Sequence, residues 1–179
     1  MYKLEKILSC IYSNLILLLK KATNYNNFHY SFPIICDSPP KIKIKEGKVF
    51  LGRISARSGL SIFCENGKIE ISDGCFFNNY CSINCQSKIT IGKNTLFGEG
   101  VKVYDHNHTF DVRTGVSHSD FVTDPIRIGD NCWIGSNCII LKGVNICNNV
   151  LVGAGAIVTK NIERPGIYIY KDGNLNEIR

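Results

Sequence analysis

Apolar residues recur at every sixth position through the C-terminal half of the chain. From residue 128 the sequence divides into the hexads IGDNCW, IGSNCI, ILKGVN, ICNNVL, VGAGAI and VTKNIE, and the first and fifth positions of each are apolar. An amphipathic helix would space its apolar residues by three and four, and a simple strand would alternate them. A fixed phase of six therefore indicates neither element.

A triangular parallel coil accounts for this period. Three short strands of about one hexad each complete one turn of a parallel β-helix, with the aliphatic residue of each hexad pointing inward. Glycine and asparagine serve the corners, where the backbone can require a positive φ. The corner residues expected on this basis are Gly129, Asn131, Gly135, Asn137, Gly143, Asn149 and Gly153.

The same phase continues upstream with less regularity. Turn-like stretches at 65–68 and 85–88 mark residues inserted at corners. We expect the coil to cover residues 41–166, after an N-terminal helical or irregular appendage at 1–40 and before a C-terminal tail at 167–179. The upstream apolar positions are Ile71, Phe77, Ile83, Ile91, Phe97 and Val103.

The repeat fails between Val103 and Ile126. The intervening residues 104–125, YDHNHTFDVRTGVSHSDFVTDP, are polar, aromatic and charged. A long loop that leaves a regular scaffold adds ordering entropy without adding core, so such loops are typical of functional sites.

The N-terminal segment is apolar between Ile7 and Leu19 and is flanked by lysines on both sides. It is short for a membrane span and carries Ser13 and Asn14 in its middle, which favours an amphipathic helix. Such a helix packs on the core or on a neighbouring subunit, or it makes peripheral membrane contact through residues 7–19.

Composition narrows the partners. The formal charge of +6 suits an anionic partner, but the basic residues are scattered and no nucleic-acid-binding motif is present, so we expect no nucleic acid. The nine cysteines form no CxxC pair, and the six-residue spacing of Cys132 and Cys138 predicts small buried core residues. An odd number without a signal peptide indicates a reducing cytoplasm.

These residues resemble the hexapeptide-repeat O-acetyltransferases, especially the sugar and polysaccharide enzymes related to maltose, galactoside and xenobiotic acetyltransferases. The resemblance covers roughly residues 65–166 and rests on the hexads, the His-bearing loop and the run IRIGDNCWIGSNCIILKGVNICNNVLVGAGAIVTKNI. It implies an all-β fold: a left-handed parallel β-helix with a protruding active-site loop and a short N-terminal helix. It also implies acetyl transfer from acetyl-CoA to a sugar hydroxyl.

The family's general base corresponds to His108 in YDHNHTF. A neutral imidazole at cytoplasmic pH is basic enough to take the proton of an acceptor hydroxyl. His106 would point the same way in an extended segment and is the second candidate. Asp105 either orients the base or forms a turn, and His118 is expected to be solvated.

The resemblance also assigns binding residues. Asn79 and Tyr104 match acceptor positions in a pocket shared between the subunits of a homotrimer, although a corner asparagine is an equal alternative for Asn79. The pantetheine arm and phosphates of acetyl-CoA would lie near outward, small or basic residues. These cofactor candidates are Trp133, Ser136, Gly153, Ala154, Thr159 and Lys160.

Three alternatives remain open. A xenobiotic acetyltransferase would need a pocket for a small free acceptor. A hydratase resembling the γ-class carbonic anhydrases would need three histidine ligands, and the spacing of His106, His108 and His118 does not look like that set, so we expect no metal. A non-catalytic scaffold would lack the loop. The chain departs from the family after the last coil, in GIYIYKDGNLNEIR, where the adenine contacts of relatives lie.

Overall fold

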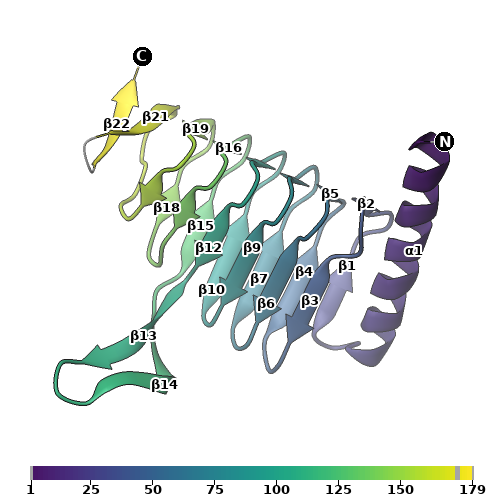
Figure 1. Ribbon diagram of the computed structural model, residues 1–179, viewed down its shortest axis with the longest axis horizontal. Coiled ribbons are helices and arrows are strands. Elements are labelled where there is room, and N and C mark those ends of the chain that lie inside the picture. Colours follow the sequence, from purple (N-terminus) through teal and green to yellow (C-terminus); the bar gives the residue numbers. More distant parts are fainter. Residues whose placement is uncertain (1, 172–173, 179) are drawn as a thin grey trace.

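The computed structural model describes residues 2–171 and 174–178 and shows one helix at the end of a solenoid of parallel strands (Figure 1). Helix α1, Tyr2–Thr23, precedes the coil. Three sheets form the three sides of the coil. The first sheet contains β1 Phe28–Tyr30, β4 Lys48–Leu51, β7 Lys68–Ile71, β10 Lys88–Ile91, β15 Ile126–Ile128 and β18 Asn145–Ile146.

The second and third sheets complete each turn. The third contains β3 Lys41–Ile44, β6 Ser61–Cys64, β9 Ser82–Cys85, β12 Lys102–Tyr104, β17 Ile139–Ile140 and β20 Ile157–Val158. The second contains β2 Ile35–Cys36, β5 Ser55–Ala56, β8 Phe76–Phe77, β11 Leu96–Phe97, β16 Trp133–Ile134, β19 Val150–Val152, β21 Gly166–Lys171 and the antiparallel β22 Asn174–Ile178.

Equivalent positions of successive coils stack in register. Ile89 pairs with Ile69 on one side and with Ile126 on the other, and all three are buried. The rings of Phe77 and Phe97 stack with centroids 4.6 Å apart inside the coil. The predicted all-β solenoid with an N-terminal helix is therefore confirmed, because the aliphatic column of the hexads forms one continuous core.

The cysteines serve this core. All nine are free thiols, and Cys132 and Cys138 are fully enclosed, as their six-residue spacing predicted. The Sγ atom of Cys138 lies 3.1 Å from the carbonyl oxygen of Gly153 in the next coil. The small side chain fits close to a neighbouring corner.

The corners use asparagine and glycine in different ways. Asn131, Asn137 and Asn149 have φ between 55° and 60°, as the pattern predicted. Of the four corner glycines expected in that region, only Gly143 has a positive φ, at 81°. Gly135 is required for close approach instead, because a Cβ atom there would lie 2.5 Å from the backbone nitrogen of Ala154.

Asn149 offers a direct test of this corner rule. Its side chain is exposed and its φ is 60°, so Asn149→Ala should lower the free energy of unfolding by about 1–2 kcal/mol through left-handed strain alone. Asn149→Gly removes the same side chain without the strain and should change stability much less. Urea unfolding followed by circular dichroism measures both, and equal losses would contradict the rule.

The strands extend beyond the predicted coil limits at both ends. β1 and β2 lie upstream of residue 41, and the buried Phe28, Ile34 and Pro40 keep the spacing of six. The segment contains Pro33, Pro39 and Pro40, a residue type common in turns, within this spacing. At the other end, β21 pairs in parallel with β19 and continues the second sheet where a tail was predicted.

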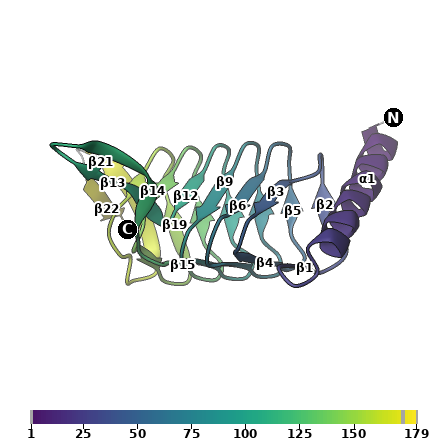
Figure 2. The ribbon, with the colours of Figure 1, turned by 90° about the horizontal axis from the view of Figure 1, so that it is seen from below.

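Helix α1 lies across the N-terminal end of the solenoid (Figure 2). Leu17 of the helix is fully buried and joins the core cluster. Within residues 2–171 and 174–178, no helix has the length and apolar character needed to cross a bilayer.

Candidate functional site

The excursion from the coil is an antiparallel hairpin that projects from the solenoid (Figure 1). Strands β13, His106–Asp111, and β14, Gly115–Thr123, leave the third sheet after β12 and return to the first sheet at β15. The backbone N–H of Asp124 donates to the carbonyl of Asp105 over 2.9 Å and joins the two ends of the hairpin where it leaves the coil. The predicted loop is thus ordered by its own strand pairing.

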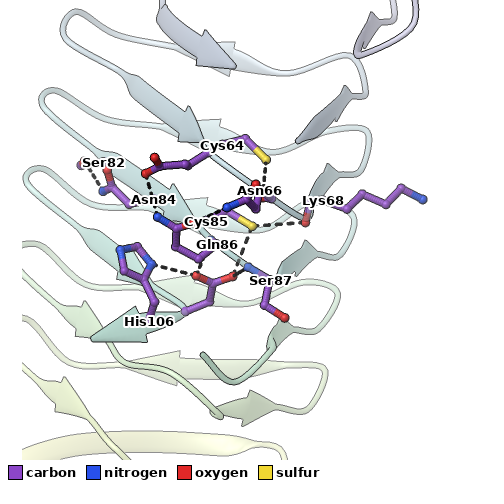
Figure 3. Close-up of polar contacts among 11 residues, drawn as sticks. Cys64, Asn66, Lys68, Ser82, Asn84, Cys85, Gln86, Ser87 and His106 are labelled. Carbon is purple, nitrogen blue, oxygen red and sulfur yellow. Dashed lines mark hydrogen bonds and ion pairs between the residues drawn. The ribbon is translucent and has the colours of Figure 1, made fainter. Parts of the chain in front are cut away.

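Asp105 anchors the hairpin to the coil through contacts with Cys85, Gln86, Ser87 and His106, four of the residues labelled in Figure 3. Its carboxylate is fully buried and accepts hydrogen bonds from the backbone N–H groups of Gln86 and Ser87, each over 2.8 Å. The Sγ atom of Cys85 lies 3.2 Å from Oδ2, and Nδ1 of His106 lies 2.9 Å from Oδ1. Asp105 is therefore a positioning residue for the neighbouring coil and for one histidine.

The carboxylate stays ionised although it is buried. Burial raises the pKa of Asp105, but the contact with His106 and the backbone donors of Gln86 and Ser87 outweigh it, so the net shift is downward. Next to this charge the pKa of the Cys85 thiol is raised, because the Cys64 side chain, burial and the carboxylate all disfavour a thiolate. Asp105 is therefore the negative charge of this cluster, and Cys85 is a neutral donor.

His106 is held in one orientation by its surroundings. Its side chain is 16% exposed and its ring packs edge-on against Tyr104 and Phe121, with centroids 6.4 and 5.2 Å away. A carboxylate can only accept a hydrogen bond, so Nδ1 of His106 carries the proton. In the neutral ring Nε2 is the free acceptor.

His108 lies further out on the same strand and is exposed. Its Nδ1 lies 3.0 Å from the carbonyl oxygen of Ser117, which can only accept, so Nδ1 carries a proton and in the neutral ring Nε2 is the acceptor. The ring of Phe121 lies 4.6 Å from that of His108 and also contacts His106. The two histidines therefore share one face of the hairpin, as the extended segment predicted.

His118 is exposed on β14, as expected. Across the residues whose placement is described, no three histidine, cysteine or acidic side chains are arranged to hold a metal ion.

A polar row continues from His106 along the edge between the third and first sheets (Figure 3). Gln86 donates from Nε2 to Oε2 of Glu65 over 2.8 Å, and Asn66 donates to Gln86 over 3.1 Å. Lys45 forms an ion pair with Glu65, and this contact, followed by that of Gln86, lowers the pKa of Glu65. The edge on the N-terminal side of the histidines is therefore lined with fixed hydrogen-bonding groups.

The predicted acceptor residues lie on different edges. Tyr104 ends β12 and touches the ring of His106. Asn79 lies at the corner between the second and third sheets, and its Oδ1 accepts from the backbone of Ser58 over 3.2 Å. Within one chain Asn79 is a corner residue and does not reach the hairpin edge.

The cofactor candidates also divide between edges. Ser136, Gly153 and Ala154 occupy corners between the second and third sheets, and Trp133 projects from the second sheet with 53% of its surface exposed. Lys160 and Thr159 follow β20 on the same edge as the hairpin. They line a cavity of about 320 Å³, whose other residues are Ile157, Asn161, Ile162, Tyr168, Tyr170 and Leu175.

Several residues of the site carry no strong sequence signal. Ser117 contributes only its carbonyl, and the backbone N–H groups of Gln86 and Ser87 lie nearly twenty residues before Asp105. Phe121 could have been found, because an antiparallel turn at DVRTG places β14 opposite β13. The register that pairs His108 with Phe121 required the structure.

Comparisons with known proteins concern the family and the fold of this chain. A sequence profile described as the hexapeptide repeat of succinyl-transferase matches residues 125–160. The galactoside O-acetyltransferase of Escherichia coli strain K12 is 31% identical over 146 residues, which are 80% of this chain and 70% of that protein. The chain spans about half the length of the first curated relatives it matches, with 42% and 51% of those proteins aligned.

Two solved structures share the fold. The polysialic acid O-acetyltransferase OatWY has a TM-score of 0.64 over 84% of this chain and 80% of its own, at 20% identity. A mutant of the N-acyltransferase AntD from Bacillus cereus, in complex with dTDP-4-amino-4,6-dideoxyglucose and coenzyme A, has a TM-score of 0.71. It covers 90% of this chain and 88% of its own at 16% identity.

Proposed function

The chain belongs to the hexapeptide-repeat acetyltransferases, the family of the galactoside O-acetyltransferase, and from this premise we propose that it transfers acetyl groups from acetyl-CoA to a sugar hydroxyl. The acceptor we propose is a surface polysaccharide or its precursor, in the cytoplasm where acetyl-CoA is made. The observation that carries the proposal is a histidine on the hairpin whose Nδ1 is fixed by a carbonyl, while its Nε2 has no hydrogen-bond partner among the described residues.

His108 is the general base in this proposal. Acetyl-CoA supplies the acetyl thioester. Nε2 of His108 accepts the proton of the sugar hydroxyl as its oxygen bonds to the thioester carbonyl carbon, and the imidazolium then returns the proton to the departing thiolate. The Ser117 carbonyl holds the tautomer that this step requires.

His106 and its neighbours are assigned to the acceptor. The Asp105 contact restricts the ring of His106, which is mostly covered, and Tyr104 lies at its edge. Together with Glu65 and Asn66, which the buried Gln86 holds by hydrogen bonds, these groups present donors and acceptors along one edge, which suits a hydroxyl-rich sugar.

We propose that the active unit is a homotrimer. Within one chain the hairpin and the corner of Ser136 and Ala154 lie on different edges of the coil, so a second copy must supply one half of the site. The outward row of the second sheet is apolar and exposed at Leu96, Trp133 and Ile167, which lie in one register and suit burial between copies.

Lys160 tests the placement of the cofactor. This residue lines the cavity of Tyr168 and Tyr170, and we assign its ammonium to the phosphates of acetyl-CoA. Lys160→Ala should raise KM for acetyl-CoA about three- to tenfold with little change in kcat, the expected loss of one exposed charge-assisted contact. Lys93→Ala, at an exposed corner between the first and second sheets, should leave KM unchanged. An equal change in both variants would contradict the assignment.

The experiment that tests the function is thiol release from acetyl-CoA by the purified full chain with a panel of oligosaccharides and small drugs. Turnover with a glycan, and acetyl ester on the recovered glycan by mass spectrometry, is the expected result. Turnover with chloramphenicol-like drugs and with no glycan would replace the proposal by xenobiotic acetylation.

A further inference from the structure

Helix α1 packs on the coil through a side on which polar residues flank the buried Leu17. Asn14 accepts at Oδ1 from the backbone N–H of Ile34 over 3.0 Å and donates from Nδ2 to the carbonyl of Ile34 over 2.7 Å. Ser9 donates to the carbonyl of Cys36 over 3.2 Å, and Ser13 is fully buried. These hydrogen bonds fix the rotation of the helix about its own axis.

The opposite side of the helix is an apolar stripe that no described part of the chain covers. Its members recur three and four residues apart, and each is between 52% and 61% exposed, although large apolar side chains of a water-facing helix normally point inward. We call it the α1 stripe, and its residues are Leu4, Ile7, Leu8, Ile11, Tyr12, Leu15, Leu18 and Leu19.

The stripe continues into a groove beside the helix. This groove of about 460 Å³ is lined by Ile11, Leu15 and Leu18 on the helix and by Tyr30 and Phe32 on the first coil. The exposed ring of Phe32 extends the apolar surface past the helix itself. The end of the solenoid therefore presents a broad apolar surface.

The positive charge of the protein is concentrated at this same end. Residues 1–57 contain 10 of the 21 basic residues and 3 of the 15 acidic ones, so they carry a formal charge of +7 and the remaining residues carry −1. Lys41 and Lys43 of β3 and Lys48 of β4 are exposed, and Figure 2 shows both strands near the end that α1 covers. An apolar centre with a basic rim is the surface that anionic membranes attract.

We propose that the α1 stripe docks this end of the solenoid on a bilayer with anionic headgroups, with the helix in the interfacial plane. The occupant is a membrane and not a second copy, because two ends that each carry +7 repel one another, whereas anionic lipid complements both the stripe and its rim. The hairpin leaves the coil after β12, the fourth strand of the third sheet counted from the end at α1. Because neighbouring strands are about 4.8 Å apart, three strand spacings separate the hairpin from that end, and it stays outside the lipid.

The test is co-sedimentation of the full chain with vesicles of phosphatidylcholine containing about one-third phosphatidylglycerol, and with vesicles of phosphatidylcholine alone. Wild type should bind the anionic vesicles at least tenfold better and lose binding as salt is raised. Ile11→Glu with Leu15→Glu should lower binding at least tenfold, and Lys41→Ala with Lys43→Ala should lower it several-fold on anionic vesicles only.

The matched control is Val112→Glu, the same exchange of an exposed apolar residue, 89% exposed at the tip of the hairpin. It should bind vesicles as wild type does, and circular dichroism shows that each variant is folded. Absence of wild-type binding, or equal binding by the stripe variant, would overturn the proposal. Light scattering that shows wild type self-associating through the stripe, with the glutamate variant of lower mass, would assign the surface to a second copy instead.

Discussion

His108→Ala is expected to lower the rate of acetyl transfer by about 10²–10⁴-fold, the usual contribution of a positioned general base. The side chain is exposed on the hairpin, so its removal opens no core cavity, and the melting temperature should stay near that of wild type. Binding of acetyl-CoA, measured by calorimetry, should persist because none of the residues assigned to the cofactor is changed. Thiol release at saturating acceptor measures the loss.

The hairpin supplies its own controls for this result. His118→Ala removes an exposed histidine of β14 and should leave turnover unchanged. His106→Ala removes a ring held by Asp105, and under our assignment it raises KM for the acceptor more than it lowers kcat. Wild-type turnover in His108→Ala together with a collapse in His106→Ala would move the base to His106.

Asp105→Ala is expected to lower the free energy of unfolding by about 2–6 kcal/mol, at about 1–3 kcal/mol for each of two buried N–H groups left without an acceptor. The variant leaves the backbone N–H groups of Gln86 and Ser87 without their acceptor inside the coil and frees the ring of His106. Denaturant unfolding measures the loss. Glu99→Ala, an exposed acidic residue at a corner, should stay within about 0.5 kcal/mol of wild type.

The same carboxylate predicts a dependence on acid. The pKa of Asp105 lies below its ordinary value of 3.8, so its contribution to stability is present above that value and is lost as the pH falls through the folded pKa. Unfolding curves from pH 6 to pH 2 should show wild type losing stability towards acid more steeply than Asp105→Asn, which has no charge to lose at this position. If the stability of both proteins fell equally with pH, Asp105 would not be the source of the acid dependence.

The repeat is the part of the fold that the sequence predicts most directly. The six-residue spacing predicts that Ile128, Ile134 and Ile140 point inward, because each side of a triangular coil takes about one hexad, and all three are buried. The coil around Phe28 and Ile34 was missed because its prolines masked the same spacing. Gly135 was expected at a corner, but the reason for it, a close approach to Ala154, depends on the next coil.

For helix α1 the sequence pattern predicts the helix but not which of its sides faces the core. The sequence predicts an amphipathic helix, and the simplest expectation is that its apolar side covers the core. The structure turns the other side inward, because Asn14 and Ser9 satisfy backbone groups of Ile34 and Cys36 at the end of the coil. Hydrogen bonds between segments twenty or more residues apart leave no periodic trace.

The sequence by itself determined the solenoid, the position of the break in it and the histidines within that break, because these follow from local spacing that every coil repeats. Only the tertiary structure decided that Asp105 serves His106 while Ser117 orients His108, since the hairpin register and the stacking of Gln86 beside Asp105 bring distant residues together. It alone also placed the hairpin and the corner of Ser136 on different edges. An edge forms only where two sheets of the closed coil meet, so the spacing within one hexad cannot predict which residues share it.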